Sequence, residues 1–330
     1  MKLAMAYFYP DHKEKIGLSH LLGVDKAVIN VCSQKTPLPE NEKWDFEPFR
    51  EKVTDFLDQK IIPEVVEGPT PLEKTKLGLP GRDAEIETFL HLIEVMDQLN
   101  IRTICYNWMP VIGWFRSATD IPARGGATVT GYDHASMKDA PLTEYGEISP
   151  ERLWKNLKYF LDAVVPCAEK HGINLAVHPD DPPVTSIRGI SRILISPQAL
   201  KKVTTLYPSP NNGITLCQGS IGAEGANVEH VIEEFAKDKK IFFAHFRDIR
   251  GTAEKFQETF HDEGQTDMYR CMKLYYKYNC DCCIRPDHVP TMPGEITDHP
   301  GYSIMGNMFA VGYMKGLMEA AKKETGGMNI

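Results

Sequence analysis

Residues 173–178 read INLAVH, a short run of apolar and β-branched residues that ends at a histidine. Three later segments repeat the arrangement and end at a cysteine, a histidine and an aspartate: GITLC at 213–217, IFFAH at 241–245 and CDCCIRPD at 280–287. Runs of this length and composition are typical of strands buried in a parallel sheet. Each of the four predicted strands therefore ends at a residue that can bind a metal ion: His178, Cys217, His245 and Asp287.

The chain on either side of these segments continues the alternation of strand and helix patterns. Four further segments are rich in β-branched and aromatic residues and bring the predicted strands to eight: 3–8, 27–31, 61–66 and 103–106. Amphipathic patterns predict helices at 12–22, 48–59, 82–99, 150–171, 197–206, 228–237, 266–278 and 301–323. Ser149 and Ser196, each directly before a proline, are predicted N-caps, and Gly172 is a predicted helix end.

Repeated βα units predict the α/β class and a parallel sheet with right-handed crossovers. Eight such units favour closure into a (β/α)8 barrel, the TIM barrel. An open, doubly wound sheet is the competing architecture, but no G-x-G-x-x-G motif follows the first predicted strand. In a barrel the carboxyl ends of all strands meet at one rim, so the four strand-end residues are expected to share one cavity.

Residues 107–149 interrupt the alternation with a long, irregular stretch that mixes glycine, proline and aromatic residues. The stretch follows the fourth predicted strand, and loops in this position lie over the catalytic mouth of a barrel. Because long loops of compact domains are usually functional, we expect an insertion that acts as an active-site lid and shields the site from water. A barrel takes about 250 residues, so the 330 residues are expected to form one barrel domain, 1–330, with this insertion.

Composition excludes several functional classes. The formal net charge of −8 offers no basic surface for nucleic acid or anionic lipid. No apolar run is long enough to span a bilayer, and the first ten residues, MKLAMAYFYP, resemble a strand more than a secretory signal. The eight cysteines are scattered without the spacing of a disulfide framework. The sequence therefore predicts a reduced, cytoplasmic protein with no nucleic-acid or membrane partner.

Each strand-end residue has an ordinary explanation when it is taken alone. A histidine after an apolar strand is often a hydrogen-bonded core residue, and a cysteine in a strand is often a small buried hydrophobe. The coincidence of all four at the same level of four consecutive strands favours a shared metal site. Its ligands would be two imidazoles, one thiolate and one carboxylate. This mixture suits Mn²⁺, Fe²⁺, Co²⁺ or Zn²⁺ better than Mg²⁺ or Ca²⁺, which prefer oxygen ligands only.

Residues beside the candidate ligands can take part in chemistry at the same cavity. His288 directly follows Asp287, and Tyr302 lies on a short segment beyond it. Both residue types can move protons, so they are the candidate acid and base. Arg247 follows His245 by two positions and can pair with a substrate carboxylate. A structural ion pair is the alternative interpretation of this arginine.

Several motifs together resemble the mannonate dehydratase family. They are HPDDPP at 178–183, CQGS at 217–220, AHFR at 244–247, FHDEGQTDM at 260–268, RPDH at 285–288 and PGYSIMGNMFAVGYMKGL at 300–317. The match runs in order from YNWMPV at 106–111 to the last predicted helix, and GLPGRD at 78–83 extends it more faintly upstream. The joint occurrence of these motifs is specific to that family.

The resemblance implies a barrel like that of xylose isomerase and the dehydration of D-mannonate to 2-keto-3-deoxy-D-gluconate in hexuronate breakdown, usually with Mn²⁺. It also implies the metal ligands, which are the four reached above from the strand ends: His178, Cys217, His245 and Asp287. The acid–base residues of the family correspond to His288 and Tyr302. Three residues within the shared motifs are candidate substrate contacts: Asn107, Arg247 and His261.

The chain departs from the family near the expected substrate, where Gly113 stands in place of an acidic residue of the loop after the fourth strand. The expected partner is therefore a small sugar acid, either D-mannonate or a closely related aldonic acid. Two alternatives stay open, namely a metal-dependent sugar isomerase or epimerase, whose product keeps its mass, and a non-catalytic sugar-acid-binding relative. By analogy with other barrel enzymes we also expect a homo-oligomer, most simply a dimer.

Overall fold

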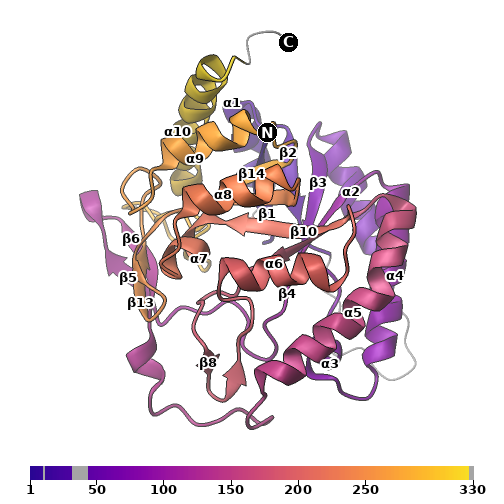
Figure 1. The fold of residues 1–330 in the computed structure, drawn as a ribbon. Coiled ribbons are helices and arrows are strands. Elements are labelled where there is room, and N and C mark those ends of the chain that lie inside the picture. Colours follow the sequence, from indigo (N-terminus) through magenta and orange to yellow (C-terminus); the bar gives the residue numbers. More distant parts are fainter. Residues whose placement is uncertain (10–11, 32–43, 327–330) are drawn as a thin grey trace.

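The computed structural model describes residues 1–9, 12–31 and 44–326, which form a closed parallel barrel surrounded by helices (Figure 1). The barrel strands follow one another around the barrel in chain order. They are β1 (Lys2–Tyr7), β2 (Lys26–Ile29), β3 (Ile62–Glu67), β4 (Thr103–Asn107), β7 (Asn174–His178), β10 (Asn212–Cys217), β11 (Ile241–Phe246) and β14 (Cys283–Pro286). Parallel pairing of β1 with β14, with Lys2 opposite Cys283, closes the barrel. The predicted (β/α)8 architecture is confirmed.

Helices cover the outside of the barrel (Figure 1). They are α1 (His12–Leu22), α2 (Glu47–Asp58), α3 (Glu73–Leu77), α4 (Arg82–Gln98), α5 (Pro150–His171), α6 (Pro197–Leu206), α7 (Gln218–Ala223), α8 (Val228–Lys237), α9 (Met268–Lys277) and α10 (Ile304–Glu324). The predicted caps are confirmed, because Ser149 Oγ accepts a hydrogen bond from the Arg152 amide and Ser196 Oγ accepts one from the Ala199 amide. Gly172 ends α5 with a φ of 62°. Within the described ranges, no helix combines the length and the apolar character that a membrane crossing requires.

One predicted strand, 280–287, is too long at its start, because β14 begins only at Cys283. The chain leaves α9 through a tight turn, in which Asn279 adopts a φ of 50° and the Cys280 amide donates to the Tyr275 carbonyl over 3.0 Å. This bond satisfies one of the last carbonyls of the helix, so Cys280 belongs to the helix end and not to the strand.

The stretch between β4 and α5 is not irregular throughout, and that expectation is wrong for two segments. β5 (Ala118–Pro122) and β6 (Thr128–Asp133) join β12 (Ile249–Thr252) and β13 (Lys255–Glu258) in a four-stranded sheet of order β12-β13-β6-β5. β6 and β13 are antiparallel, with Tyr132 opposite Phe256. We call this four-stranded sheet the mouth sheet, because the chain enters it from the carboxyl ends of β4 and β11. Another small hairpin, β8 (Ser186–Ile187) with β9 (Ile190–Ser191), lies between β7 and α6.

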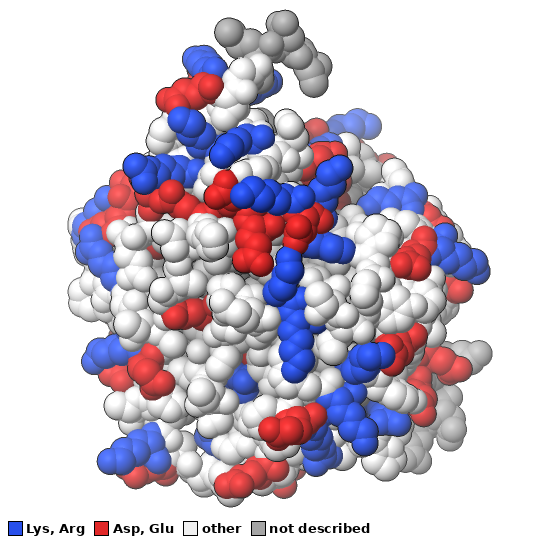
Figure 2. Space-filling model, viewed as in Figure 1, with Lys and Arg blue, Asp and Glu red and all other residues white. Residues whose placement is uncertain are grey.

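Charged side chains of both signs lie side by side over the face of the molecule shown in Figure 2. On the adjacent helices α8 and α9, Glu233 lies 3.4 Å from Lys237 and 3.6 Å from Lys277. Exposed pairs of this kind typically contribute about 0–1 kcal/mol each. The stability of the fold therefore depends mainly on the apolar packing between strands and helices.

Side chains alternate between two environments along the barrel strands, as the period of two requires. One set packs outward against the helices in the main core, for example Met5, Ile104 and Leu216. The other set fills the inside of the barrel with a small apolar layer: Ala4, Val28, Val65, Cys105, Ala176, Phe243 and Cys283. Two positions further along, on the same inward face, the layer becomes polar and consists of Glu67, Asn107, His178, His245 and Arg285. The strand period therefore brings the functional groups to the carboxyl rim.

Candidate active site

The polar layer opens into a small cavity of about 120 Å³ that is partly open to solvent. Its lining includes six of the residues predicted from the sequence: Asn107, His178, His245, Asp287, His288 and Tyr302. It also includes Glu67, Trp114, Asp181 and Arg285. The candidate ligand Cys217 is fully buried and lies outside this lining among the described residues.

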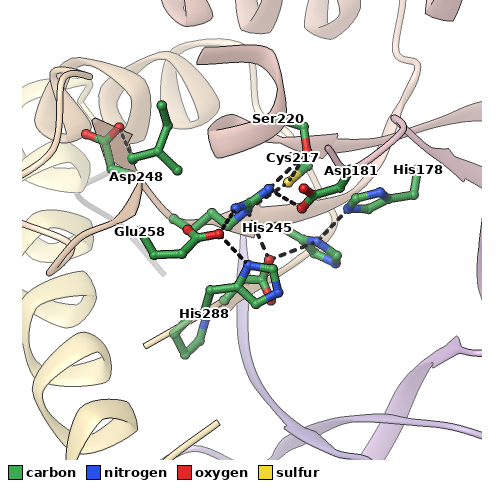
Figure 3. A network of polar contacts seen from close by, with 12 residues as sticks. His178, Asp181, Cys217, Ser220, His245, Asp248, Glu258 and His288 are labelled. Carbon is green, nitrogen blue, oxygen red and sulfur yellow. Dashed lines mark hydrogen bonds and ion pairs between the residues drawn. The ribbon is translucent and has the colours of Figure 1, made fainter. Parts of the chain in front are cut away.

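The two candidate histidine ligands point toward each other (Figure 3). His178 ends β7, and its Nδ1 donates to the Pro179 carbonyl over 2.6 Å, which leaves Nε2 as the nitrogen with the free lone pair. Nε2 of His178 lies 3.0 Å from Nδ1 of His245. Two nitrogens bound to one tetrahedral ion at about 2.05 Å lie roughly 3.3 Å apart. The spacing of this pair therefore fits two ligands of a single ion.

The other two candidate ligands differ in how they lie relative to the histidines. Cys217 lies close to both histidines, whereas Asp287 lies beside this group. The ligand atoms of His178, Cys217 and His245 all lie within 4.8 Å of one another. Asp287 Oδ2 lies 3.6 Å from His245 Nδ1, but within the described chain no set with this mutual spacing includes Asp287. Its other oxygen, Oδ1, accepts from Arg285 Nη1 over 2.7 Å. The structure thus brings three candidate ligands together, with Asp287 at their edge.

The charges around these residues fit a bound cation. Burial would raise the pKa of the Cys217 thiol, but Arg247 and His178 hold that pKa well below its ordinary value. Burial would also raise the pKa of Asp287, yet Arg285 and the neighbouring cations hold it well below its ordinary value. Burial would lower the pKa of His245, but the carboxylates of Glu67 and Asp287 raise it well above its ordinary value. The site therefore offers a thiolate, a carboxylate and an imidazole that releases a proton when an ion binds.

Glu67 supports His245 from the side opposite His178. Glu67 Oε1 lies 3.2 Å from His245 Nε2, while both Glu67 oxygens accept from Arg285 over 2.8 and 2.9 Å. Burial would raise the pKa of Glu67, but Arg285 and His245 lower it to about 2. A carboxylate beside the second nitrogen of a ligating imidazole orients the ring and increases its basicity. Glu67 has this position relative to the candidate centre.

A second group of buried charges lies beside the candidate ligands. Arg116 donates to both oxygens of Asp181 over 2.6 and 2.9 Å and also to Glu258. Arg247 donates to the same two carboxylates. All four side chains are 1% exposed. These two cations and two anions form a buried square. Figure 3 shows His288 beside Glu258, one of its members.

The two candidate acid–base residues, His288 and Tyr302, both line the cavity. The rings of His288 and Tyr302 have centroids 5.9 Å apart, and Trp114 lies 5.0 Å from His288 on another side. His288 adopts a φ of 45°, which is uncommon for a residue other than glycine. Such strained residues concentrate at functional sites. The structure therefore brings His288 and Tyr302 to the same cavity as the candidate ligands.

The three candidate substrate contacts have different surroundings. Asn107 lines the cavity, and its Oδ1 accepts from Lys76 Nζ and from the Met109 amide, both over 3.1 Å. Arg247 is buried, and its guanidinium is engaged by protein groups, including Cys217 Sγ over 3.2 Å. The alternative of a structural ion pair fits this arginine. His261 is fully buried and does not belong to the cavity lining of the described chain.

Several site residues were missed in the sequence, and two of them carry a usable signal. Glu67 ends β3 as His178 ends β7, so the search for polar strand ends could include it. Arg285 precedes Asp287 by two positions and therefore faces the same side of its strand. Arg116 and Glu258 lie in segments without a clear period, and nothing in their local sequence indicates that they meet.

Comparison with known proteins agrees with this geometry. The family model for D-mannonate dehydratase (UxuA) matches residues 1–144 and 139–326. Mannonate dehydratase 2 of Halalkalibacterium halodurans is 32% identical over 352 aligned residues, which cover 97% of this chain and 99% of that protein. The mannonate dehydratase of Streptococcus agalactiae is 33% identical over 340 residues, which cover 94% of each chain.

Solved structures give the same result. The crystal structure of mannonate dehydratase from Streptococcus suis serotype 2 matches with a TM-score of 0.91 and 30% identity over 99% of this chain and 96% of that one. A D-tagatose 3-epimerase-like protein matches with a TM-score of 0.64 at 15% identity, which indicates a shared barrel fold only. With matches over nearly its whole length, the chain belongs to the mannonate dehydratase family.

Proposed function

We propose that this protein is a hydro-lyase that removes water from D-mannonate, or from a closely related aldonic acid, to give 2-keto-3-deoxy-D-gluconate. Family membership supports the reaction class. The observation that carries the proposal is the cavity itself, where two candidate ligands, His178 and His245, line the same space as two groups able to move protons, His288 and Tyr302.

The proposed cofactor is one divalent metal ion, Mn²⁺ by preference, with Fe²⁺, Co²⁺ and Zn²⁺ as alternatives. The residues that would hold it are His178, Cys217, His245 and Asp287. The spacing of the two imidazoles and the anionic states of the thiolate and carboxylate support this assignment. The chemistry that such an ion supplies when bound is stabilisation of the negative charge that develops on the substrate carboxylate as the C2 proton leaves.

The residues of this chain would carry out the proton transfers. In the proposed β-elimination, one of His288 and Tyr302 accepts the proton from C2 as the C2–H bond breaks. The electron pair forms the C2–C3 double bond, the C3–O bond breaks, and the other residue protonates the departing hydroxyl so that it leaves as water. The enol then tautomerises to the 2-keto-3-deoxy acid. Both side chains line the cavity, which supports these roles.

We also propose that segment 107–149 acts as a lid over the cavity. Trp114, which belongs to this segment, lines the cavity and lies against His288. Arg116 in the same segment reaches the buried charges beside the site. Both contacts would help to exclude water during elimination. The organisation of 1–330 as one domain, a dimeric assembly and a cytoplasmic location stay predictions.

The deciding experiment is turnover of D-mannonate by chelator-stripped protein with and without added Mn²⁺. We expect a 2-keto-3-deoxy acid, lighter than the substrate by one water, only when the ion is present. The matched control is His178→Ala, which should lose bound metal and turnover together. A product of unchanged mass would favour an isomerase or epimerase. Tight binding of the sugar acid without any product would favour a non-catalytic relative.

A further inference from the structure

His288 is held by a carboxylate that the sequence did not indicate. Glu258, the last residue of β13, lies with its Oε1 3.0 Å from Nδ1 of His288. The nitrogen on the other side of the ring, Nε2, lies 3.7 Å from Asp287 Oδ1, beyond hydrogen-bond distance. The ring therefore presents Nδ1 to the mouth sheet and Nε2 to the candidate metal centre.

The partners of Nδ1 determine which nitrogen carries the proton. Arg116 Nη2 also lies near Nδ1, at 3.3 Å, and arginine can only donate. However, the two hydrogens of Nη2 already have acceptors, Asp181 Oδ2 at 2.9 Å and Glu258 Oε1 at 2.5 Å. Burial would raise the pKa of Glu258, but Arg247, His288 and Arg116 lower it to about 2, so this carboxylate only accepts. The bond that remains is Nδ1–H of His288 donating to Glu258.

A purely structural role for Glu258 would be to neutralise the two arginines. Asp181 and Glu258 each pair with both Arg116 and Arg247 without any contribution from His288. The bond to His288 is therefore an additional contact of Glu258, and this contact orients the ring. The backbone of His288 is also held in the left-handed region, at a φ of 45°, a strained conformation that persists only where the surroundings fix the residue.

From this geometry we propose that Glu258 is the positioning residue of His288. It keeps the proton on Nδ1 and leaves Nε2 bare and directed at the cavity for proton exchange with the substrate. Because β13 pairs with β6 of the segment after β4, the mouth sheet fixes the carboxylate that fixes the catalytic ring. The role assigned to the ring rests on the proposed function, whereas the tautomer does not.

The test combines nitrogen NMR of ¹⁵N-histidine-labelled protein with kinetics. Protonated and bare ring nitrogens resonate far apart, and the His288 signals can be assigned from their loss in His288→Gln. In the wild-type protein the His288 ring should show a protonated Nδ1 and a bare Nε2. Glu258→Gln should shift His288 toward a mixture of both forms. It should also lower kcat by about 10- to 100-fold while KM stays within about threefold.

Two further variants separate positioning from a structural effect. Glu258→Asp keeps the charge that the arginines need but withdraws the oxygen from Nδ1, so it should fold and still lose the preference for protonated Nδ1. Asp181→Asn removes the other carboxylate of the same square, which makes no hydrogen bond to His288 in the described structure. It should lower stability as Glu258→Gln does but leave the His288 nitrogen signals in place.

The proposal is overturned if wild-type His288 carries its proton on Nε2, or if both Glu258 variants keep the wild-type nitrogen signals. A loss of kcat in Glu258→Gln with unmoved signals would likewise reduce Glu258 to a structural role. Because the spectra need no substrate, failure of the proposed function is recognised separately. In that case no protein turns D-mannonate over, while the dependence of the His288 proton on Glu258 is still observed.

Discussion

His261 offers a test of the electrostatics near the site that needs neither metal nor substrate. Its side chain is fully buried, and within the described chain neither ring nitrogen has a hydrogen-bond partner of good geometry. The ring lies 6.2 Å from that of Phe246, nearly parallel to it. Burial lowers the pKa of His261 from 6.5 to about 4, and the nearby backbone of Phe246 and the carboxylates of Asp287 and Glu258 oppose this only in part.

The sign of the pH effect follows from the two pKa values. Between about pH 4 and 6.5 the unfolded chain binds a proton at His261 and the folded protein does not, so the free energy of unfolding rises with pH across this window. The contribution of His261 to the free energy of unfolding is fully present above pH 6.5 and is lost as the pH falls toward 4. This contribution is about 3 kcal/mol in total, and about 2 kcal/mol of it is lost between about pH 7.5 and pH 5.

The assay is urea unfolding of wild-type protein and of His261→Phe at these two pH values, with chelator present so that metal release does not contribute. The quantity compared is the change with pH in each protein, so the packing cost of the substitution cancels. Between the two pH values, the free energy of unfolding of the wild-type protein should fall by about 2 kcal/mol more than that of the variant. Equal losses in the two proteins would refute a neutral, buried His261. A large rise in KM for the variant would show that this residue contacts substrate after all.

Three further substitutions test other parts of the site. Tyr302→Phe should lower kcat by about 10²- to 10⁴-fold without a change in melting temperature, and a full rate would remove Tyr302 from proton transfer. Arg116→Ala should cost about 3–5 kcal/mol of unfolding free energy because it leaves two buried carboxylates with one arginine; a loss below about 1 kcal/mol would contradict the buried square. Cys217→Ser should weaken Zn²⁺ binding by at least about 10- to 100-fold and Mn²⁺ binding by less, because Zn²⁺ prefers thiolate more strongly. An equal loss of Zn²⁺ and Mn²⁺ affinity in competition dialysis would argue against Cys217 as a ligand.

The barrel is predictable from the sequence because each of its strands is marked locally. Apolar runs of the right length end at polar residues, and capped amphipathic helices separate them, as with Ser149 before α5 and Ser196 before α6. The inward face of a strand has a period of two, so the position of His178 and His245 at one rim follows from the pattern once the barrel is assumed.

The mouth sheet could not be predicted in the same way. β5 and β6 are short and mix polar residues with apolar ones. Besides β5, β6 pairs with β13, more than a hundred positions along the chain. The ion pair between Arg116 and Glu258 spans 142 positions. Local sequence order places Arg247 and His261 near the site. It does not show that Arg247 donates its hydrogen bonds to buried carboxylates, or that His261 lies outside the cavity lining.

The closure of the barrel has a consequence for how the chain is made. Among the barrel strands β1 is synthesised first, but one of its edges pairs with β14. The pairing of Lys2 with Cys283 therefore cannot form until β14 has been synthesised. Until then the nascent sheet has two open edges, with unpaired amides and carbonyls that can pair with another chain. The apolar residues of β1, among them Ala4 and Met5, remain accessible for the same period. A chain that is truncated within α9 would therefore be prone to aggregate, although this truncated chain already contains His178, Cys217 and His245.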